Sequence, residues 1–287
     1  MIYQKTLFAF IMLFFFSAKI TKAGILNDST TSKSIEPYDS TKRKIAFANN
    51  NVHTEYYTIP ANVIYPSILK ENVEETKDYV EKFVNSRKDY VLRMYSKGKA
   101  SFPKIITAFK KYNLPEEYRV LIALESAFNG NAVSGVGAVG YWQIMDKVAK
   151  EYKINYISRD GKKSDTSSKR KTFTDDRKNF TKSTIVAAKY LRDRNRNLHG
   201  NVLLIVASYN CGIGNVWKAM AKSGKTNPSF WDVKQFLPME TRNYVMNFIA
   251  LNVLFKNYKN MVANNLIFNP IKVKKGNSLE KNNTAAL

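Results

Sequence analysis

A single glutamate on the apolar face of an expected helix is the residue whose position points most directly to chemistry. Tyr118, Leu121, Ile122 and Glu125 recur at i, i+3, i+4 and i+7 and therefore share one helix face. Burial at such a position disfavours the charged carboxylate and raises its pKa. A carboxylic acid that keeps its proton near neutral pH can donate it to a leaving oxygen. The same spacing also fits a structural Glu at the rim of a core helix, paired with a Lys or Arg.

The elements that must position this residue are expected to be helices. Amphipathic patterns predict helices at Val73 to Tyr95, Phe102 to Tyr112, Pro115 to about Asn129, Trp142 to Tyr152, Ser183 to Leu198, Val202 to Tyr209, Asn215 to Ala221 and Met239 to about Tyr258. Asn201 is the expected N-cap of one of them, and Asn129-Gly130-Asn131 is expected to end the helix of Glu125. Convincing strands are nearly absent, so the predicted fold class is mainly α.

One glycine-rich stretch matches a nucleotide-binding pattern that we reject. Gly135 to Gly140 fits G-x-G-x-x-G, but that fingerprint must follow a strand inside a βαβ unit. Here a helix stop and the loop Asn131 to Ser134 precede it. The glycines are better explained by a turn, or by close approach of the backbone to a ligand.

Both ends of the chain differ in composition from its middle. Residues 1–23 have a basic start, an apolar stretch from Leu7 to Phe16 and a small-residue end, the pattern of a secretory signal peptide. Residues 24–67 are polar and are predicted to be a flexible leader, and residues 261–287 a polar tail. Between them, residues 68–260 are predicted to form the folded domain.

The residue inventory excludes several kinds of chemistry. One cysteine, Cys211, and two histidines make a structural zinc site and Cys-His or Ser-His-Asp catalysis poor explanations, and we expect neither metal nor cofactor. The formal charge of +23 favours polyanionic partners. Export would make nucleic acid the weakest of these, and peripheral association with the membrane or the cell envelope stays open.

Four motifs in order carry a resemblance to a known family. They are Glu125-Ser126-Ala127-Phe128, Gly140-Tyr141-Trp142-Gln143-Ile144-Met145, Ser208-Tyr209-Asn210-Cys211-Gly212, and Pro238-Met239-Glu240-Thr241-Arg242-Asn243-Tyr244-Val245. Their order and spacing resemble the soluble lytic transglycosylase (SLT) domain, most closely the membrane-bound lytic murein transglycosylase D type. The resemblance covers about Val73 to Asn257.

The resemblance implies a lysozyme-like α fold that cleaves the β-1,4 bond between N-acetylmuramic acid and N-acetylglucosamine in peptidoglycan. It implies a 1,6-anhydromuramyl product, made without water, in the periplasm or cell envelope of a bacterium. By position, Glu125 matches the sole catalytic acid, which would later act as the base. The expected substrate-binding residues are Ser126, Gln143, Tyr209, Asn210 and Tyr244. Core packing is the alternative for Tyr244, and backbone capping is the alternative for Gln143 and Asn210.

Departures from the family pattern leave alternatives open. Tyr141 stands where Leu is usual and Asp146 where Pro is common, and residues 157–171 form a longer link. A hydrolase resembling goose-type lysozyme would need a second carboxylate to position water, with Asp146, Asp175 or Asp176 as candidates. A non-catalytic glycan-binding protein is a third interpretation, disfavoured by the intact motifs.

Overall fold

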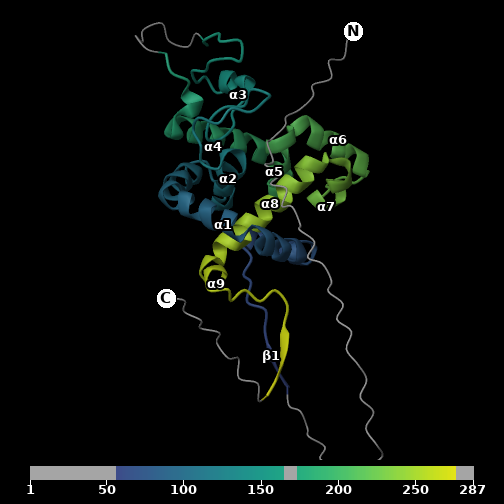
Figure 1. The fold of residues 1–287 in the computed structure, drawn as a ribbon. Coiled ribbons are helices and arrows are strands. Elements are labelled where there is room, and N and C mark those ends of the chain that lie inside the picture. The colour runs from purple at the N-terminus through teal and green to yellow at the C-terminus, as the bar shows by residue number, and fades with distance from the viewer. Residues whose placement is uncertain (1–55, 165–172, 276–287) are drawn as a thin grey trace, which may run out of the picture. The chain divides into compact units, whose positions relative to one another are not determined.

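The computed structural model describes residues 56–164 and 173–275, which fall into a helical unit and a small β unit (Figure 1). The helical unit spans residues 60–270. Its α-helices are α1 (Val73–Lys110), α2 (Leu121–Ser126), α3 (Asp146–Glu151), α4 (Phe180–Asn197), α5 (Val202–Cys211), α6 (Ile213–Ser223), α7 (Phe230–Val233), α8 (Met239–Lys256) and α9 (Tyr258–Val262). Short 3-10 helices are η1 (Ser67–Asn72), η2 (Glu116–Val120), η3 (Asp176–Lys178) and η4 (Lys234–Phe236). The mainly α class is thus observed.

Helix α8 forms the centre of the helical unit. Most of its side chains are buried on every face, as expected of a helix surrounded by protein rather than lying on a surface. It packs mainly against α1 and α5, and Figure 1 shows it between them. Tyr244 belongs to α8 and Tyr209 to α5, so two predicted site residues come from elements in direct contact.

Helix α1 is one long element where the sequence pattern predicts two. Its only residue with non-helical backbone angles is Arg87 (φ −137°, ψ 24°), so the break lies earlier than the expected gap between Tyr95 and Phe102. Gly98 lies inside this helix, and the ring of Phe102 packs so closely against its Cα that a side chain there would clash. Pro103 is accommodated within the helix.

The helix of Glu125 ends earlier than predicted. It begins as the 3-10 helix η2 and continues as α2, which stops at Ser126. Ala127 takes a left-handed conformation (φ 49°, ψ 38°) and Phe128 follows with φ 66°. Such angles are unfavourable for non-glycine residues and concentrate at functional sites.

The prediction of a helix from Trp142 is also wrong at its start. Helix α3 begins only at Asp146, and residues 142–145 belong to a looped segment with isolated β-bridges that join Val139 to Val133 and to Ile144. No strand–turn–helix unit surrounds the glycines of this segment, which supports the rejection of the nucleotide fingerprint. Gly140 (φ 82°) instead lies against the backbone of Arg177, at a place where any Cβ would clash with the Arg177 carbonyl oxygen.

Order extends beyond both predicted ends of the domain. Tyr65 is buried and its hydroxyl bonds to Thr76, although it falls in the stretch assigned to a flexible leader. Met261 and Phe268 are buried, although they fall in the stretch predicted to be a polar tail. The β unit consists of strands β1 (Tyr56–Ile59) and β2 (Ile271–Lys274), which pair antiparallel with Tyr56 opposite Lys274. The signal-peptide prediction concerns residues 1–23, outside the described part.

Candidate active site

Glu125 lies in the last turn of α2 and contacts Tyr244 of α8. The Tyr244 hydroxyl donates a hydrogen bond to Glu125 Oε1 at 2.5 Å. Tyr118, Leu121 and Ile122 on the same helix face are fully buried, whereas Glu125 keeps part of its surface exposed. The predicted helix face is therefore confirmed, and the carboxyl group sits where that apolar face reaches the surface.

The environment of Glu125 raises its pKa from about 4.5 to about 8. Burial is the main cause, the hydrogen bond from Tyr244 acts in the opposite direction, and the negative charge of Glu240 adds to the rise. None of the ion pairs in the described part of the chain includes Glu125, so the interpretation of a rim Glu paired with Lys or Arg is not supported. At neutral pH this side chain is a protonated acid.

Tyr209 of α5 is the second tyrosine of the site. Its hydroxyl donates to the carbonyl oxygen of Trp142 at 2.9 Å. Burial first, and then the negative charge of Glu125, raise the pKa of Tyr209 well above its usual value. The same two causes raise the pKa of Tyr244. Both tyrosines are therefore neutral hydrogen-bond donors beside the acid.

The loop from Gly140 to Ile144 is anchored through its carbonyl oxygens. Ser126 Oγ donates to the Tyr141 carbonyl at 2.8 Å, and Gln143 Nε2 donates to that of Gly140 at 2.9 Å. Gln143 has a positive φ of 46°. Ser126 and Gln143 thus both hold the loop that adjoins the acid, which is a structural task in addition to the predicted contact with substrate.

Asn210 joins the end of α5 to the start of α8. Its Oδ1 accepts a hydrogen bond from Thr241 Oγ1 at 2.7 Å. Thr241 is buried and lies one turn before Tyr244. The structure thus brings together the ends of three helices that carry Glu125 on α2, Tyr209 and Asn210 on α5, and Tyr244 on α8. Trp142 is a core residue, fully buried and hydrogen-bonded to Thr184.

The aspartates considered as second carboxylates are engaged elsewhere. Arg177, which is fully buried, donates from Nη1 to Asp146 at 2.5 Å and from Nη2 to Asp175 at 2.7 Å. Asp176 pairs with Lys182 at 2.6 Å. Burial alone would raise the pKa of Asp175, but the hydrogen bonds and charge of Arg177 outweigh it and the pKa is lowered. These carboxylates are therefore committed to ion pairs.

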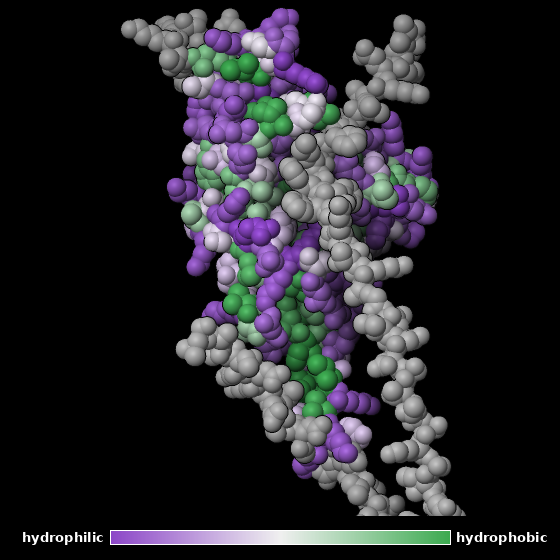
Figure 2. All heavy atoms as spheres, in the orientation of Figure 1, coloured by the Kyte–Doolittle hydropathy of each residue, from purple (hydrophilic) through white to green (hydrophobic). Residues whose placement is uncertain are grey.

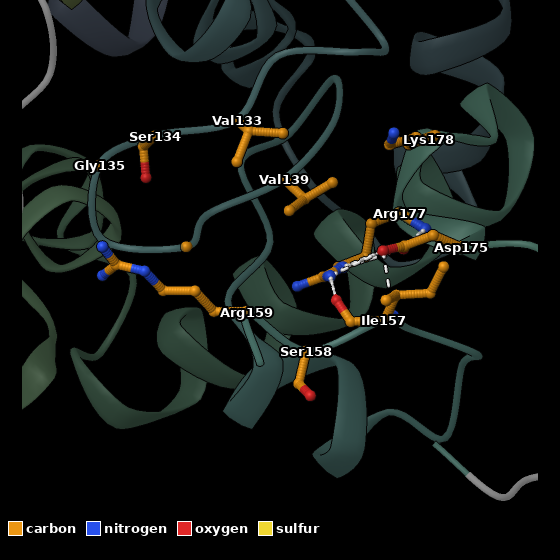
Figure 3. Close-up of a pocket in the computed structure, with 11 residues that line it drawn as sticks. Val133, Ser134, Gly135, Val139, Ile157, Ser158, Arg159, Asp175, Arg177 and Lys178 are labelled. Carbon is orange, nitrogen blue, oxygen red and sulfur yellow. Dashed lines mark hydrogen bonds and ion pairs between the residues drawn. The ribbon is translucent and has the colours of Figure 1, made fainter. Parts of the chain in front are cut away.

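A hollow of about 340 Å³ lies beside this ion-pair cluster (Figure 3). Val133, Val139 and Ile157 supply apolar walls, while Asp175 and Arg177 bond to each other at its side. The Arg177 Nη2 atom also donates to the Ile157 carbonyl oxygen at 2.6 Å. Glu125 and the tyrosines do not line this hollow.

Sequence reasoning missed Arg177 and Thr241 as site-supporting residues. Arg177 also donates to the Ile144 carbonyl oxygen at 3.3 Å and so helps to fix the loop that contains Gln143. The run Thr174-Asp175-Asp176-Arg177-Lys178 is polar throughout and has no apolar pattern that would mark Arg177 as buried. An Arg directly after two Asp residues, in a connection that leads into a helix, is the one sequence signal of a buried ion pair here.

Within the described residues, no group of three or more His, Cys, Asp or Glu side chains is arranged to hold a metal ion. None of the helices found there is long and apolar enough to cross a membrane.

The fold and site define a helical protein with one candidate general acid between two tyrosines. Residues 103–231 match the transglycosylase SLT domain family, so this part of the chain is similar to an SLT domain. This match bears out the predicted resemblance to the SLT domain, and the helical structure bears out the predicted mainly α class. It includes the motifs of Glu125, Gln143, Tyr209 and Asn210, whereas Tyr244 lies beyond it.

The chain is similar to the membrane-bound lytic murein transglycosylase D of Escherichia coli K12. The two are 34% identical over 152 residues, which is 52% of this chain and 30% of the relative. The chain therefore spans less than a third of that relative's length. A solved structure of an inactive mutant of the lytic transglycosylase Slt from Pseudomonas aeruginosa is 23% identical, with a TM-score of 0.43, over 56% of this chain and 25% of that one. The 70-kDa soluble lytic transglycosylase in complex with bulgecin A is 19% identical, with a TM-score of 0.43, over 70% of this chain and 37% of that one.

Proposed function

We propose that this protein is a peptidoglycan lytic transglycosylase that cleaves the β-1,4 bond between N-acetylmuramic acid and N-acetylglucosamine. The observation that carries the proposal is Glu125, whose pKa of about 8 and hydrogen bond to Tyr244 make it a protonated, oriented acid at neutral pH. The substrate class, peptidoglycan, is inferred from the match to the SLT domain family and from the similarity to a lytic murein transglycosylase.

In the proposed mechanism Glu125 serves both chemical steps. It first protonates the glycosidic oxygen as the leaving sugar departs. The resulting carboxylate then accepts the proton of the muramoyl 6-hydroxyl, which attacks the anomeric carbon and closes a 1,6-anhydro ring. This hydroxyl is already held close to the carbon, so its attack avoids the entropic cost of capturing a second reactant. Tyr244 donates to Glu125 throughout and steadies the carboxylate after proton transfer.

The surrounding residues are proposed to orient the sugar and the acid. Tyr209 and Tyr244 are neutral donors beside Glu125. Asn210 presents its side-chain amide at the junction of α5 and α8, fixed by Thr241. Ser126 and Gln143 hold the loop that forms the adjoining wall, and Gln143 in its strained conformation is proposed to face the substrate as well.

A hydrolase remains the second candidate, and one contact favours considering it. Glu240, in the first turn of α8, lies close enough to Glu125 for its charge to raise the pKa of that acid. The Glu240 side chain is exposed. If water rather than the 6-hydroxyl attacks, Glu240 is the carboxylate that we would test first as the group that positions it, because its charge acts on Glu125.

Digestion of purified peptidoglycan in H₂¹⁸O separates the two functions. A transglycosylase gives anhydro ends with no ¹⁸O, and a hydrolase gives reducing ends that carry ¹⁸O and weigh one water more. We expect anhydro products from the wild type and none from Glu125→Gln in the same preparation. Labelled reducing ends would overturn the proposal, and Glu240→Gln would then be the variant expected to abolish the labelling.

We further propose that the chain is exported to the periplasm or cell envelope and takes part in cell-wall turnover. The support is the charge and apolar pattern of residues 1–23, together with the wall polymer as proposed substrate. N-terminal analysis of protein recovered from the cell envelope is expected to find Gly24 at or near the start. Recovery with Met1 intact would contradict cleavage of a signal peptide.

A further inference from the structure

Helix α1 carries two very different charge patterns along its length. From Val73 to Asp89 it contains five acidic and four basic residues, whereas the chain from Tyr90 to Pro115 contains six basic residues and no acidic one. If lysines were simply abundant throughout the chain, the two halves of one helix would not differ in charge in this way. The C-terminal half of α1 is therefore a local basic feature, beyond the general positive charge of the chain.

Four of these cations lie along one side of the helix. Arg93, Lys97, Lys104 and Lys111 are separated by four, seven and seven residues. At 100° per residue they fall within about 40° of one another and span about 27 Å along the axis. We call this row the basic stripe; all four residues are exposed.

The rest of the exposed face complements the basic stripe. Lys99 and Lys110 lie on the opposite flank of the same helix segment, and both are exposed. The crest between the flanks is formed by exposed residues without long side chains, Ser96, Ala100, Pro103 and Thr107. No bulky side chain on this crest would keep a flat surface away from the helix, and hydrophilic surface covers much of the helical unit in the view of Figure 2.

The charges of the basic stripe are available to a partner. None of the ion pairs in the described part of the chain involves one of its residues. Lys97 donates to the carbonyl oxygen of Ala127 at 3.1 Å, which brings the basic stripe next to the end of the Glu125 helix. The nearest acid after the helix, Glu116, is paired with Arg119.

We propose that this face of α1 docks on an anionic phospholipid bilayer. A row of cations about 27 Å long, with further cations on the other flank, matches an extended plane of phosphates better than one small anion. Each Lys or Arg near such a surface contributes about 1 kcal/mol of attraction. A linear soluble polyanion would be served by a single row and would leave the second flank unused. Docking would hold the enzyme at the membrane through charge alone.

Vesicle co-sedimentation of the full chain tests this proposal. The stripe variant is Arg93→Gln, Lys104→Gln and Lys111→Gln, and it spares Lys97 because of its contact beside the active site. The matched control is Lys70→Gln, Lys77→Gln and Lys82→Gln, which removes the same charge beside Glu71, Asp78 and Glu81. Circular dichroism and peptidoglycan cleavage verify that both variants fold.

The wild type is expected to bind vesicles of phosphatidylglycerol and phosphatidylcholine, and not vesicles of phosphatidylcholine alone. The stripe variant should bind the anionic vesicles ten- to a hundredfold more weakly, and the control no more than about threefold more weakly. Equal losses in both variants would mean that net charge alone acts, and would overturn the proposal. Absence of wild-type binding, or binding confined to dextran sulfate as a soluble polyanion, would also overturn it.

Discussion

Glu125 and Asp175 are both withdrawn from water, yet their pKa values move in opposite directions. Burial would raise both. Asp175 receives hydrogen bonds and a positive charge from Arg177, which lower its pKa, whereas Glu125 receives one neutral hydroxyl from Tyr244 and the like charge of Glu240. The comparison teaches that the partner, not burial, decides whether a carboxyl group becomes an acid or one half of an ion pair.

The largest expected effect comes from a substitution that removes the acidic proton of Glu125. Glu125→Gln keeps the shape of the side chain but cannot donate, so peptidoglycan cleavage should fall by about a thousandfold or more. Release of soluble muropeptides measures it. Asp175→Asn is the opposing substitution and should retain measurable cleavage if folded. Near-native turnover by a folded Glu125→Gln would show that the acid lies elsewhere.

Breaking the ion pairs of Arg177 should lower the stability of the protein rather than change its catalytic chemistry. Arg177→Met leaves Asp175 and Asp146 without their cation and should cost about 3–5 kcal/mol in the free energy of unfolding. Arg196→Met, which breaks an exposed pair with Asp193 at 3.9 Å, should cost less than about 1 kcal/mol. Urea denaturation measures both. Equal costs would mean that the buried cluster is not a structural anchor.

Replacing Tyr244, the neutral hydrogen-bond partner of Glu125, tests how far its hydroxyl lowers the Glu125 pKa. The hydrogen bond from Tyr244 lowers the Glu125 pKa, so Tyr244→Phe should raise that pKa and move the alkaline fall of cleavage to higher pH. The rate itself should drop about tenfold through loss of orientation. Tyr79→Phe is the control, because its hydroxyl also bonds to a side chain of α8, that of Asn247. An unchanged pH profile for Tyr244→Phe would contradict the contact.

The smallest effect is a pH-dependent gain in stability. Because the folded pKa of Glu125 is raised above its ordinary value, its contribution favours the folded state at acid pH and is lost as pH rises from about 4.5 through about 8. The variant Glu125→Gln has no carboxyl group to titrate at this position, so it does not lose this stability. The variant should match the wild type near pH 4.5 and exceed it by about 1–2 kcal/mol near pH 9, a discounted value because Glu125 is partly exposed. Equal stability at both pH values would argue against the raised pKa.

The helices were predictable where a repeating apolar pattern decides the structure. Helices α4, α5 and α8 were found to within a few residues, and Asn201 caps α5 as expected. The end of α2 was not found, because Ala127 is held in a left-handed conformation that its own side chain does not favour. The pairing of β1 with β2 joins segments about 200 residues apart and leaves no local signal.

The candidate site was predictable from motifs and only partly from physics. The face of Glu125 follows from helical spacing, and its neighbours Tyr209 and Tyr244 came from the family resemblance. The looped conformation of residues 142–145 was missed because side chains distant in sequence capture its carbonyl oxygens, among them Tyr209 and Arg177. Such long-range hydrogen bonds override local helical preference and cannot be read from spacing.

A direct titration of Glu125 tests whether this residue holds a proton at neutral pH. Side-chain carboxyl ¹³C shifts of glutamate-labelled protein can be followed by NMR across pH, with Glu125→Gln identifying the signal. We predict that the Glu125 carboxyl titrates at about 8. A midpoint near 4.5 would contradict it, because Glu125 would then be a carboxylate at neutral pH with no proton to give to the glycosidic oxygen.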